Sequence, residues 1–306
     1  MVNISQLPED TSEVYVKFGK SEIIRDWSQF PGLPFAFDFE SNFERDYQRR
    51  WLYYHWSISL YTSIAYLAFI YFGKIWMRKR EPFSLRYPMA TWNFALALFS
   101  MFGTLRCLPE FIHIIAHEGM ESSFCSSSFY RDVRLTLWYW LFVWSKIVEL
   151  GDTVFIILRK QKLIFLHWIH HVLTLNYAFF VIGDAPGTAR WMVSMNFAIH
   201  TAMYTYYGLK ALRVRIARPI AMIITIAQIV QMIFGLYINY QAYVIRRTGG
   251  VCDTSLSASL CGLSIYFLFF LLFMNFFLSA YLTNFGLKGV RNVLKTTAKD
   301  VANKVD

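Results

Sequence analysis

The feature that most constrains this chain is a series of seven apolar stretches, each close to the length that a helix needs to cross a bilayer. A hydrocarbon core about 30 Å thick is spanned by about 20 helical residues. The stretches are Tyr53–Phe72, Ala90–Ile112, Leu135–Leu158, Leu163–Val181, Trp191–Leu209, Pro219–Tyr240 and Leu260–Leu282. Because backbone amides inside a bilayer must be satisfied within the chain, we predict an all-α integral membrane protein with seven transmembrane helices.

The composition supports this fold class. The chain is 56% hydrophobic and only 16% charged, whereas soluble domains contain about 25% charged residues. We divide the chain into a polar N-terminal extension at 1–50, a seven-helix transmembrane domain at 51–285, which we predict to be catalytic, and a basic tail at 286–306.

The basic residues indicate how the chain crosses the membrane. They cluster after the first, third and fifth apolar stretches and in the tail, and an odd number of spans places all four clusters on one side. Cytosolic loops are enriched in Lys and Arg, so we predict a cytosolic C-terminus and a lumenal N-terminus. The same clustering explains the net charge of +10 without a nucleic-acid-binding face. The clusters are Lys74, Arg78, Lys79, Arg80 and Arg86; Arg159, Lys160 and Lys162; Lys210, Arg213, Arg215 and Arg218; and Lys288, Arg291, Lys295, Lys299 and Lys304, with Arg246 and Arg247 as exceptions on the other side.

Two features of the predicted lumenal side agree with this topology. The sequon Asn3-Ile4-Ser5 predicts glycosylation of Asn3, which this topology places in the lumen. Cys125 and Cys252 fall in two different lumenal loops, where a disulfide is permitted. Two unrelated free thiols remain an equal alternative, while the cysteine spacing does not fit a zinc module.

Ionisable and amide side chains are concentrated inside four of the apolar stretches. Such groups are costly within a bilayer, so they usually face the bundle interior and mark a functional site. Their spacing of three and four residues places those of each stretch near one helical face. They are Lys146, Glu149 and Asp152; His167, His170 and His171; Asn196, His200, Tyr204 and Tyr207; and Thr225, Gln228 and Gln231.

These side chains are predicted to meet at one level. With a rise of about 1.5 Å per residue, Asp152, His170, His200 and Gln228 lie about 9, 10, 15 and 18 Å from the predicted cytosolic ends of their helices. Simpler readings remain open for some of them. Lys146 with Glu149 can be a neutralising pair between spans, the glutamines can serve helix packing, and the tyrosines can be interfacial aromatics. Three histidines within five residues are harder to explain by packing alone.

The pattern His-x-x-His-His at 167–171 is compatible with two chemistries. A di-iron desaturase or hydroxylase needs several histidine clusters around two metals. However, the second apparent pair, His113 and His117, lies at the lumenal end of its span, as does His55, so depth disfavours this reading. In acyl transfer, an imidazole attacks a thioester to form an acyl-imidazole. A second imidazole and an amide, here His200 and Asn196, stabilise an enolate. A transporter or receptor with a polar membrane site is the third alternative.

The ordered motifs resemble those of the ELO/ELOVL fatty-acid elongases, the very-long-chain 3-oxoacyl-CoA synthases. The similarity covers roughly 50–290, and Trp168 is typical of the subgroup that elongates saturated and monounsaturated long-chain acyl-CoAs. The motifs are Lys146-x-x-Glu149-x-x-Asp152-Thr153, His167-Trp168-Ile169-His170-His171, Asn196-x-x-x-His200-x-x-Met203-Tyr204-x-Tyr206-Tyr207, Thr225-x-x-Gln228-x-x-Gln231, and a first loop Lys79-Arg80-Glu81-Pro82-Phe83-x-Leu85-Arg86.

The resemblance implies an enzyme of the endoplasmic reticulum membrane whose helices two to seven enclose an acyl tunnel. It would condense acyl-CoA with malonyl-CoA, releasing CoA and carbon dioxide, without a metal or other cofactor. His170 would be the nucleophile, His200 and Asn196 would assist decarboxylation, and His167 and His171 would complete the polar layer. Self-association and association with other elongation-cycle enzymes stay open.

Two points lie outside the resemblance. Arg159, Lys162 and Lys210 are our choices for binding the CoA phosphates, because they flank the predicted cytosolic mouth of the tunnel. Many members of the family end in a dilysine signal, whereas this tail ends in Asn303-Lys304-Val305-Asp306. The predicted residence in the reticulum therefore depends on the resemblance and not on the tail.

Overall fold

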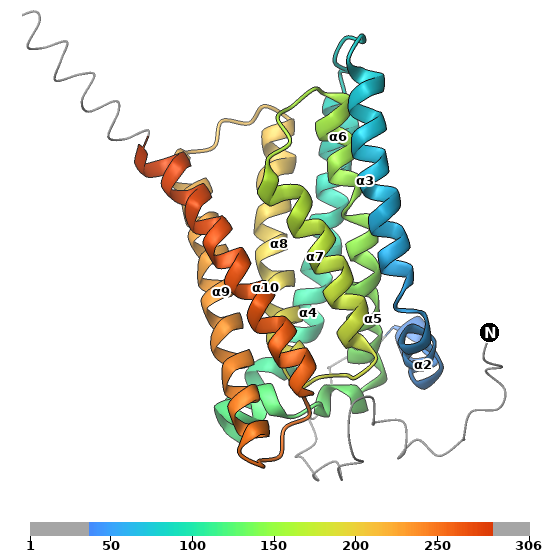
Figure 1. Cartoon of the computed structure of the whole chain (residues 1–306), viewed down its shortest axis with the longest axis vertical. Helices are drawn as coiled ribbons and strands as arrows, with labels where there is room; N and C mark the ends of the chain where they lie inside the picture. Colours follow the sequence, from blue (N-terminus) through green and yellow to red (C-terminus); the bar gives the residue numbers. More distant parts are fainter. Residues whose placement is uncertain (1–36, 284–306) are drawn as a thin grey trace, which may run out of the picture.

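A computed structural model describes residues 37–283 as a bundle of helices, and it contains no strand within that range (Figure 1). The predictions for Asn3 and for the basic tail lie outside these residues. The elements are α1 (Asp38–Ser41), α2 (Arg45–His55), α3 (Ile58–Met77), α4 (Arg86–Cys125), η3 (Ser128–Arg131), α5 (Val133–Val148), α6 (Gly151–Leu158), α7 (Phe165–Ile182), α8 (Ala189–Ala211), α9 (Arg218–Arg247), α10 (Leu256–Phe277) and a π-helical turn, η4 (Leu278–Thr283).

Five of the described helices are long and apolar enough to cross a membrane: α3, α4, α7, α9, and α10 with its continuation to Tyr281. The protein is therefore all-helical within residues 37–283, and it is a membrane protein, as predicted. The predicted third span is divided into α5 and α6 between Val148 and Gly151, which leaves neither piece long enough. The predicted fifth span, α8, has 23 residues but carries several polar side chains. Seven crossings remain a prediction.

The predicted basic loops that the structure describes meet at one end of the bundle, at the top of Figure 1. The backbone amide of Phe83 donates to the carbonyl of Leu158 at 3.0 Å, and the Arg86 guanidinium donates to the carbonyl of Leu212 at 2.6 Å. These bonds join the loops that precede α4, α7 and α9. We call this the basic end of the bundle, and the opposite end, which contains Cys125 and Cys252, the disulfide end.

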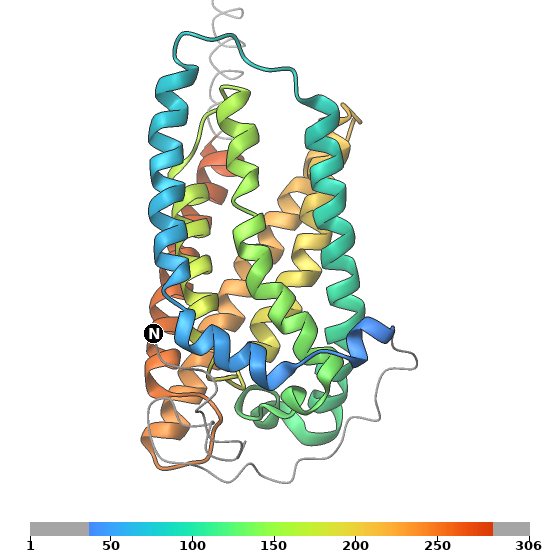
Figure 2. The ribbon, with the colours of Figure 1, turned by 90° about the vertical axis from the view of Figure 1, so that its right-hand side faces the viewer.

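The first apolar stretch begins later than the sequence predicts. Tyr53 belongs to α2, which lies across the disulfide end (Figure 2) and contacts α5 and α7. The chain turns at Trp56, and the apolar α3 begins at Ile58. The prediction was wrong here because the aromatic residues of α2 continue the apolar pattern of α3 in sequence, although the two helices run in different directions.

The N-terminal segment is attached to the bundle by one buried carboxylate. Glu40 of α1 is fully buried and accepts hydrogen bonds from the Arg106 guanidinium at 2.8 and 2.9 Å. It also accepts a 2.8 Å bond from the Trp138 indole. Arg106 belongs to α4 and Trp138 to α5. An Arg–carboxylate pair with two parallel bonds is strong and directional, so this contact fixes α1 against the disulfide end.

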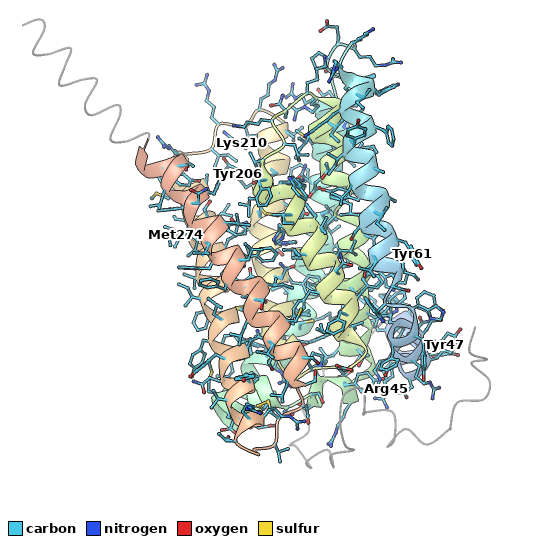
Figure 3. The ribbon with its side chains drawn as sticks, viewed as in Figure 1. Arg45, Tyr47, Tyr61, Tyr206, Lys210 and Met274 are labelled. Carbon is cyan, nitrogen blue, oxygen red and sulfur yellow. A yellow bond between two sulfur atoms is a disulfide. The ribbon has the colours of Figure 1, made fainter. Side chains whose placement is uncertain are left out.

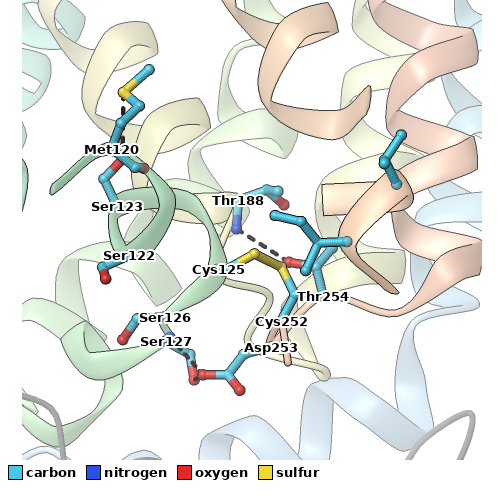
Figure 4. Close-up of a disulfide and its surroundings, with 12 residues drawn as sticks. Met120, Ser122, Ser123, Cys125, Ser126, Ser127, Thr188, Cys252, Asp253 and Thr254 are labelled. Atoms are coloured by element: carbon cyan, nitrogen blue, oxygen red, sulfur yellow. Dashed lines mark hydrogen bonds between the residues drawn. A yellow bond between two sulfur atoms is a disulfide. The ribbon is translucent and has the colours of Figure 1, made fainter. Parts of the chain in front are cut away.

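The disulfide end is held together by a covalent and an ionic contact. Cys125, at the end of α4, is joined to Cys252 in the loop before α10 (Figure 4), which is the predicted pairing. Nearby, the fully buried Arg190 of α8 forms a 2.9 Å ion pair with Glu110 of α4. The Arg190 side chain also donates to the carbonyl oxygens of Ser122, Ser123 and Ser126. These contacts tie α4, α8 and the α9–α10 loop together.

The helices α4 and α8 pack along most of their lengths, as do α9 and α10. Gly103 explains the close approach of the first pair, because a Cβ atom at this position would lie 2.6 Å from the Phe197 ring. The helix α4 continues past the predicted boundary at Ile112 to Cys125, with a change of direction at Gly119, where φ is 86°. This conformation is accessible mainly to glycine.

Candidate active site

A polar layer crosses the interior of the bundle, and its first part joins α5 to α8. Lys146 Nζ donates to Glu149 Oε1 at 2.7 Å and to Asn196 Oδ1 at 2.9 Å. The Asn196 amide nitrogen lies 3.1 Å from His200 Nε2. Glu149 also accepts a 2.9 Å bond from the Ser145 hydroxyl. Lys146 and Glu149 are each only 4% exposed, so the ion pair and its hydrogen bonds offset the cost of burying two charges.

The interruption between α5 and α6 places the acidic residues of the layer. Asp152 follows a tight turn in which its backbone amide bonds to the carbonyl of Glu149 at 3.1 Å. Its carboxylate accepts hydrogen bonds from the Trp92 indole at 2.7 Å and the Tyr204 hydroxyl at 2.9 Å. Gly151 is required beside it, because a Cβ atom would lie 2.5 Å from the Trp92 ring. The turn therefore joins α6 to α4 and α8.

The histidine box on α7 is connected to α3 and α6. His167 Nε2 lies 2.9 Å from the Thr153 hydroxyl, which lies 2.7 Å from the Tyr66 hydroxyl of α3. The ring of His171 is buried next to that of His167, with 4.6 Å between centroids. It also faces the Tyr66 ring at 6.5 Å. These contacts fix His167 and His171 on the side of α7 that faces α3.

His170 lies in a different environment, on the side of α7 that faces α10. Its ring centroid is 4.7 Å from that of Phe269 and 6.1 Å from that of Phe273. Its ring centroid also lies 5.8 Å from that of His171, the neighbouring residue of the box. The Nδ1 atom of His170 is buried and has no hydrogen-bonding partner among residues 37–283. Buried polar atoms are nearly always paired, so an unpaired imidazole nitrogen is a candidate reactive group.

The remaining predicted residues lie at the edge of this network or outside it. Gln228 donates to the Met203 sulfur at 3.3 Å, and Gln231 is buried on α9. Tyr207 is 49% exposed and packs against Tyr206, 5.6 Å away between ring centroids. Its placement therefore differs from the predicted inward position.

The residues chosen for CoA binding lie at the basic end. The Arg159 guanidinium contacts the Met89 sulfur at 2.9 Å. Lys162 is exposed, and the exposed Lys210 lies above the Tyr206 ring at 5.9 Å (Figure 3). The three cations thus lie at the end of the bundle nearer to the histidine box. Within residues 37–283, the structure records no contact between any two of them.

The other histidines are separate from the layer. The rings of His113 and His117 stack with 4.2 Å between centroids, in the part of α4 that leads to the disulfide end, and His55 stacks on Trp51 in α2. Within residues 37–283, no three His, Cys, Asp or Glu side chains are grouped in a way that would hold a metal ion.

Tyr66 and Trp92 are members of the layer that sequence reasoning missed. Both are aromatic residues inside apolar helices, and neither belongs to a polar stripe. A sequence signal for these two residues would have been a hydroxyl or indole at the same depth as the histidines. Many other aromatic residues of this chain lie at that depth, so the signal does not single them out.

Comparison with known proteins gives a consistent result. Residues 51–288 match the model of the ELO: GNS1/SUR4 family. The chain is 41% identical over 282 residues to the protein named very long chain fatty acid elongase 6 of Drosophila melanogaster, covering 91% of this chain and 89% of that protein. It is 40% identical over 246 residues to the Gallus gallus protein of the same name, covering 80% and 92%. It is 36% identical over 263 residues to long chain fatty acid elongase 1 of Caenorhabditis elegans, covering 86% and 90%.

Proposed function

The chain belongs to the ELO family of fatty-acid elongases, and from this membership we propose that it catalyses the condensing step of elongation. In this step, an acyl-CoA and malonyl-CoA give 3-oxoacyl-CoA, CoA and carbon dioxide. The observation that carries the proposal is the His170 ring, whose buried Nδ1 lacks a hydrogen-bonding partner among the described residues while its face packs on Phe269. An imidazole between a polar layer and an apolar surface suits a reaction at the head of an acyl chain.

The first half-reaction transfers the acyl group to the enzyme. The neutral His170 imidazole attacks the thioester carbonyl, the carbon–sulfur bond breaks, and the CoA thiolate leaves and takes up the imidazole proton. The product is an acyl-imidazole on His170. Covalent catalysis of this kind divides one difficult step into two easier ones. Phe269 and Phe273 line the site with apolar surface that excludes water from the intermediate.

The second half-reaction forms the new carbon–carbon bond. Malonyl-CoA loses carbon dioxide, and the electron pair of the broken bond becomes an enolate of the thioester. Asn196 and His200 act together on the enolate: the second N–H of the Asn196 amide donates to the enolate oxygen, and His200 holds that amide in place by accepting its other N–H, because hydrogen-bond donors held in place act most strongly where charge develops. The enolate carbon attacks the acyl carbonyl, the bond to His170 breaks, and the departing imidazole takes up one proton from solvent, which replaces the proton that left with CoA.

Several finer features belong to the same proposal. The divided helix α5–α6 and the polar helix α8 also cross the membrane, which gives seven crossings, and helices α4 to α10 enclose the acyl tunnel. The basic end faces the cytosol, where CoA esters are available, and the membrane is that of the endoplasmic reticulum. The resemblance at Trp168 favours saturated and monounsaturated long-chain substrates. Arg159, Lys162 and Lys210 bind CoA phosphates. The reaction uses no metal or flavin.

The test is a condensation assay with the full chain in microsomes. Radiolabelled malonyl-CoA and a series of acyl-CoAs are supplied, with and without a metal chelator, and labelled 3-oxoacyl-CoA is measured. We expect labelled product in both conditions, with one equivalent of carbon dioxide released per product. Failure to form labelled 3-oxoacyl-CoA from any acyl-CoA of the series rejects the condensing role. If labelled product forms without the chelator but not in its presence, the metal-free mechanism is rejected.

A further inference from the structure

Asp152 is a carboxylate inside the bundle that the condensation chemistry described above does not use. Its two oxygens accept hydrogen bonds from different helices, one from the Trp92 indole of α4 at 2.7 Å and one from the Tyr204 hydroxyl of α8 at 2.9 Å. The Trp92 ring also lies directly against α6, because a Cβ atom at Gly151 would be 2.5 Å from it. We call Trp92, Asp152 and Tyr204 the Asp152 clamp. Neither donor is a cation, so hydrogen bonds alone connect the three helices here.

The clamp lies at one level of the bundle, on the basic side of His200. At a rise of about 1.5 Å per residue, Trp92 and Asp152 each lie about 9 Å from the basic ends of α4 and α6, and Tyr204 lies about 10 Å from that of α8. His200 lies four residues further along α8, which is about 6 Å deeper. The clamp is therefore positioned between His200 and the basic end.

The exposure of the inward stripe of α8 changes at Tyr204. Tyr207, one turn nearer to the basic end, is 49% exposed, whereas Tyr204 is 2% and His200 is 7% exposed. The Tyr204 ring stands nearly perpendicular to the His200 ring, with 5.3 Å between centroids. The hydroxyl of this same ring is bonded to Asp152. Tyr204 thus covers His200 at the point where α8 becomes buried, and Asp152 holds it there.

The residue after Asp152 continues these contacts to the other side of α6. The Thr153 hydroxyl lies 2.9 Å from His167 of α7 and 2.7 Å from the Tyr66 hydroxyl of α3. Side-chain hydrogen bonds of two adjacent residues therefore tie α6 to α3, α4, α7 and α8. The helices α9 and α10 contribute to none of these bonds, so the tied helices close one side of the bundle at this level and leave the other side to α9 and α10.

The enolate of the second half-reaction has water as a competitor for the acyl group. If water reaches the enolate carbon, the carbon takes a proton from water instead of attacking the acyl carbonyl. The products are acetyl-CoA and hydroxide, and the hydroxide combines with the released carbon dioxide to give bicarbonate. The acyl group stays on His170, so malonyl-CoA is consumed without elongation. Exclusion of water prevents such side reactions.

We propose that the Asp152 clamp is a water barrier that couples decarboxylation of malonyl-CoA to condensation. This inference rests on the proposed function, because it requires an enolate to form beside His200. Tyr204 closes the site toward the basic end, and Trp92 and Asp152 hold Tyr204 by positioning, without reacting themselves. The CoA arm of malonyl-CoA passes along α9 and α10, which supply no residue of the clamp. Removing the Tyr204 hydroxyl leaves one oxygen of Asp152 without its donor, and a polar group in this state recruits water.

The test measures how the label of malonyl-CoA labelled at C-2 divides between acetyl-CoA and 3-oxoacyl-CoA, with full-length protein purified in detergent and an acyl-CoA in excess. Tyr204→Phe removes the hydroxyl but keeps the ring, and Trp92→Phe removes the indole donor. In each variant the ratio of acetyl-CoA to 3-oxoacyl-CoA is expected to rise about fivefold, the factor that corresponds to one hydrogen bond of ordinary strength. A loss of stability alone would lower both products together and leave the ratio unchanged.

Two substitutions at the disulfide end are matched controls. Tyr130→Phe removes a tyrosine hydroxyl that donates to Asp46 at 2.8 Å, and Trp191→Phe removes an indole N–H that donates to Ser123 at 2.9 Å. Both aromatic residues are buried, so each control loses a bond of the same kind without contact to the clamp. Their ratio of acetyl-CoA to 3-oxoacyl-CoA is expected to stay at the wild-type value.

A third variant covers the case in which an aromatic substitution prevents folding. Asp152→Asn keeps the shape of the side chain but points an amide N–H at one of the two donors, so one bond is lost and the ratio is expected to rise. If the folded clamp variants keep the wild-type ratio, whether or not their rate falls, the water barrier is wrong. It is also wrong if the controls raise the ratio equally. The proposed function is judged on wild type alone, because absence of labelled 3-oxoacyl-CoA there rejects the condensing role, whereas an unchanged ratio rejects only the barrier.

Discussion

Glu149 Oε1 lies 3.8 Å from His200 Nδ1, across the interface between the α5–α6 turn and α8. The same oxygen accepts the 2.7 Å hydrogen bond of Lys146, which also donates to Asn196 Oδ1. An ammonium group only donates, so the Asn196 amide nitrogen faces His200 and donates to Nε2. The proton of His200 is therefore assigned to Nδ1, on the side of Glu149. One ion pair thus orients both the amide and the imidazole.

Glu149→Gln is expected to reduce both stability and condensation activity. The substitution keeps the shape of the side chain but leaves Lys146 buried without an anion, which typically costs about 3–5 kcal/mol. The double variant Lys146→Met with Glu149→Met removes both charges and is expected to be more stable than Glu149→Gln, yet still poorly active because Asn196 and His200 lose their support. Thermal unfolding in detergent and the condensation assay measure the two effects. A double variant as unstable as Glu149→Gln contradicts the assignment.

The sequence predicts this part of the site well because helical periodicity governs it. Lys146 and Glu149 are three residues apart on one helix, and Asn196 and His200 are four apart on another, so each pair shares a helical face. Equal depth then brings the two faces together. The turn between α5 and α6 was missed, because no proline marks it and it consists of i→i−3 hydrogen bonds, from Leu150 to Ile147 and from Asp152 to Glu149, which arise from local tightening of the helix.

Contacts between distant helices were less accessible to sequence reasoning. Tyr66 reaches Thr153 from α3, a helix that the predicted tunnel does not include, and only the packing of α3 against α6 and α7 brings the hydroxyl into the layer. Tyr207 shows a second limit of helical periodicity. It continues the stripe of His200 and Tyr204 by spacing but is half exposed, since periodicity fixes a helical face and not what covers it.

Tyr66→Phe is expected to weaken the support of His167 without changing the fold. It removes the hydroxyl from the chain Tyr66–Thr153–His167, and the loss of one such hydrogen bond costs about 1 kcal/mol. A reduced kcat with little change in KM is expected, because His167 is oriented through Thr153 and does not itself bind the substrate. Tyr61→Phe, on an exposed tyrosine of the same helix, is the control. Equal effects of both substitutions would show that the Tyr66 hydroxyl has no special role.

His170→Ala is expected to abolish formation of the acyl-enzyme. In the absence of malonyl-CoA, the wild type releases at most one CoA per enzyme from an acyl-CoA, while the variant releases none, and steady-state condensation falls by about a hundredfold or more. His117→Ala, an exposed histidine of α4, serves as the control and keeps the wild-type burst. Mass spectrometry of the intact protein detects the acyl group directly. A full burst of CoA from His170→Ala would assign the nucleophile elsewhere.

The disulfide is expected to contribute stability but not catalysis. Cys125 and Cys252 are 127 residues apart. Closing a loop of this size lowers the conformational entropy of the unfolded chain, which raises the free energy of unfolding by about 5 kcal/mol. For a domain of this size, Cys125→Ser with Cys252→Ser should therefore lower the Tm by about 10 °C or more. Condensation well below the new Tm should stay near the wild-type rate, because the bond lies at the end of the bundle opposite the basic end that flanks the histidine box.

Cys261→Ser provides the matched control, since Cys261 is a free cysteine in α10. Its Tm should change little, and added reductant should lower the Tm of the wild type while leaving that of the double serine variant unchanged. A double variant that melts with the wild type would mean that the bond adds no net stability. The double variant could instead lose condensation at temperatures where it is fully folded. That result would mean that the α9–α10 loop controls the position of Phe269 against His170. The structural reason is that α10, which carries Phe269, begins at Leu256, shortly after Cys252.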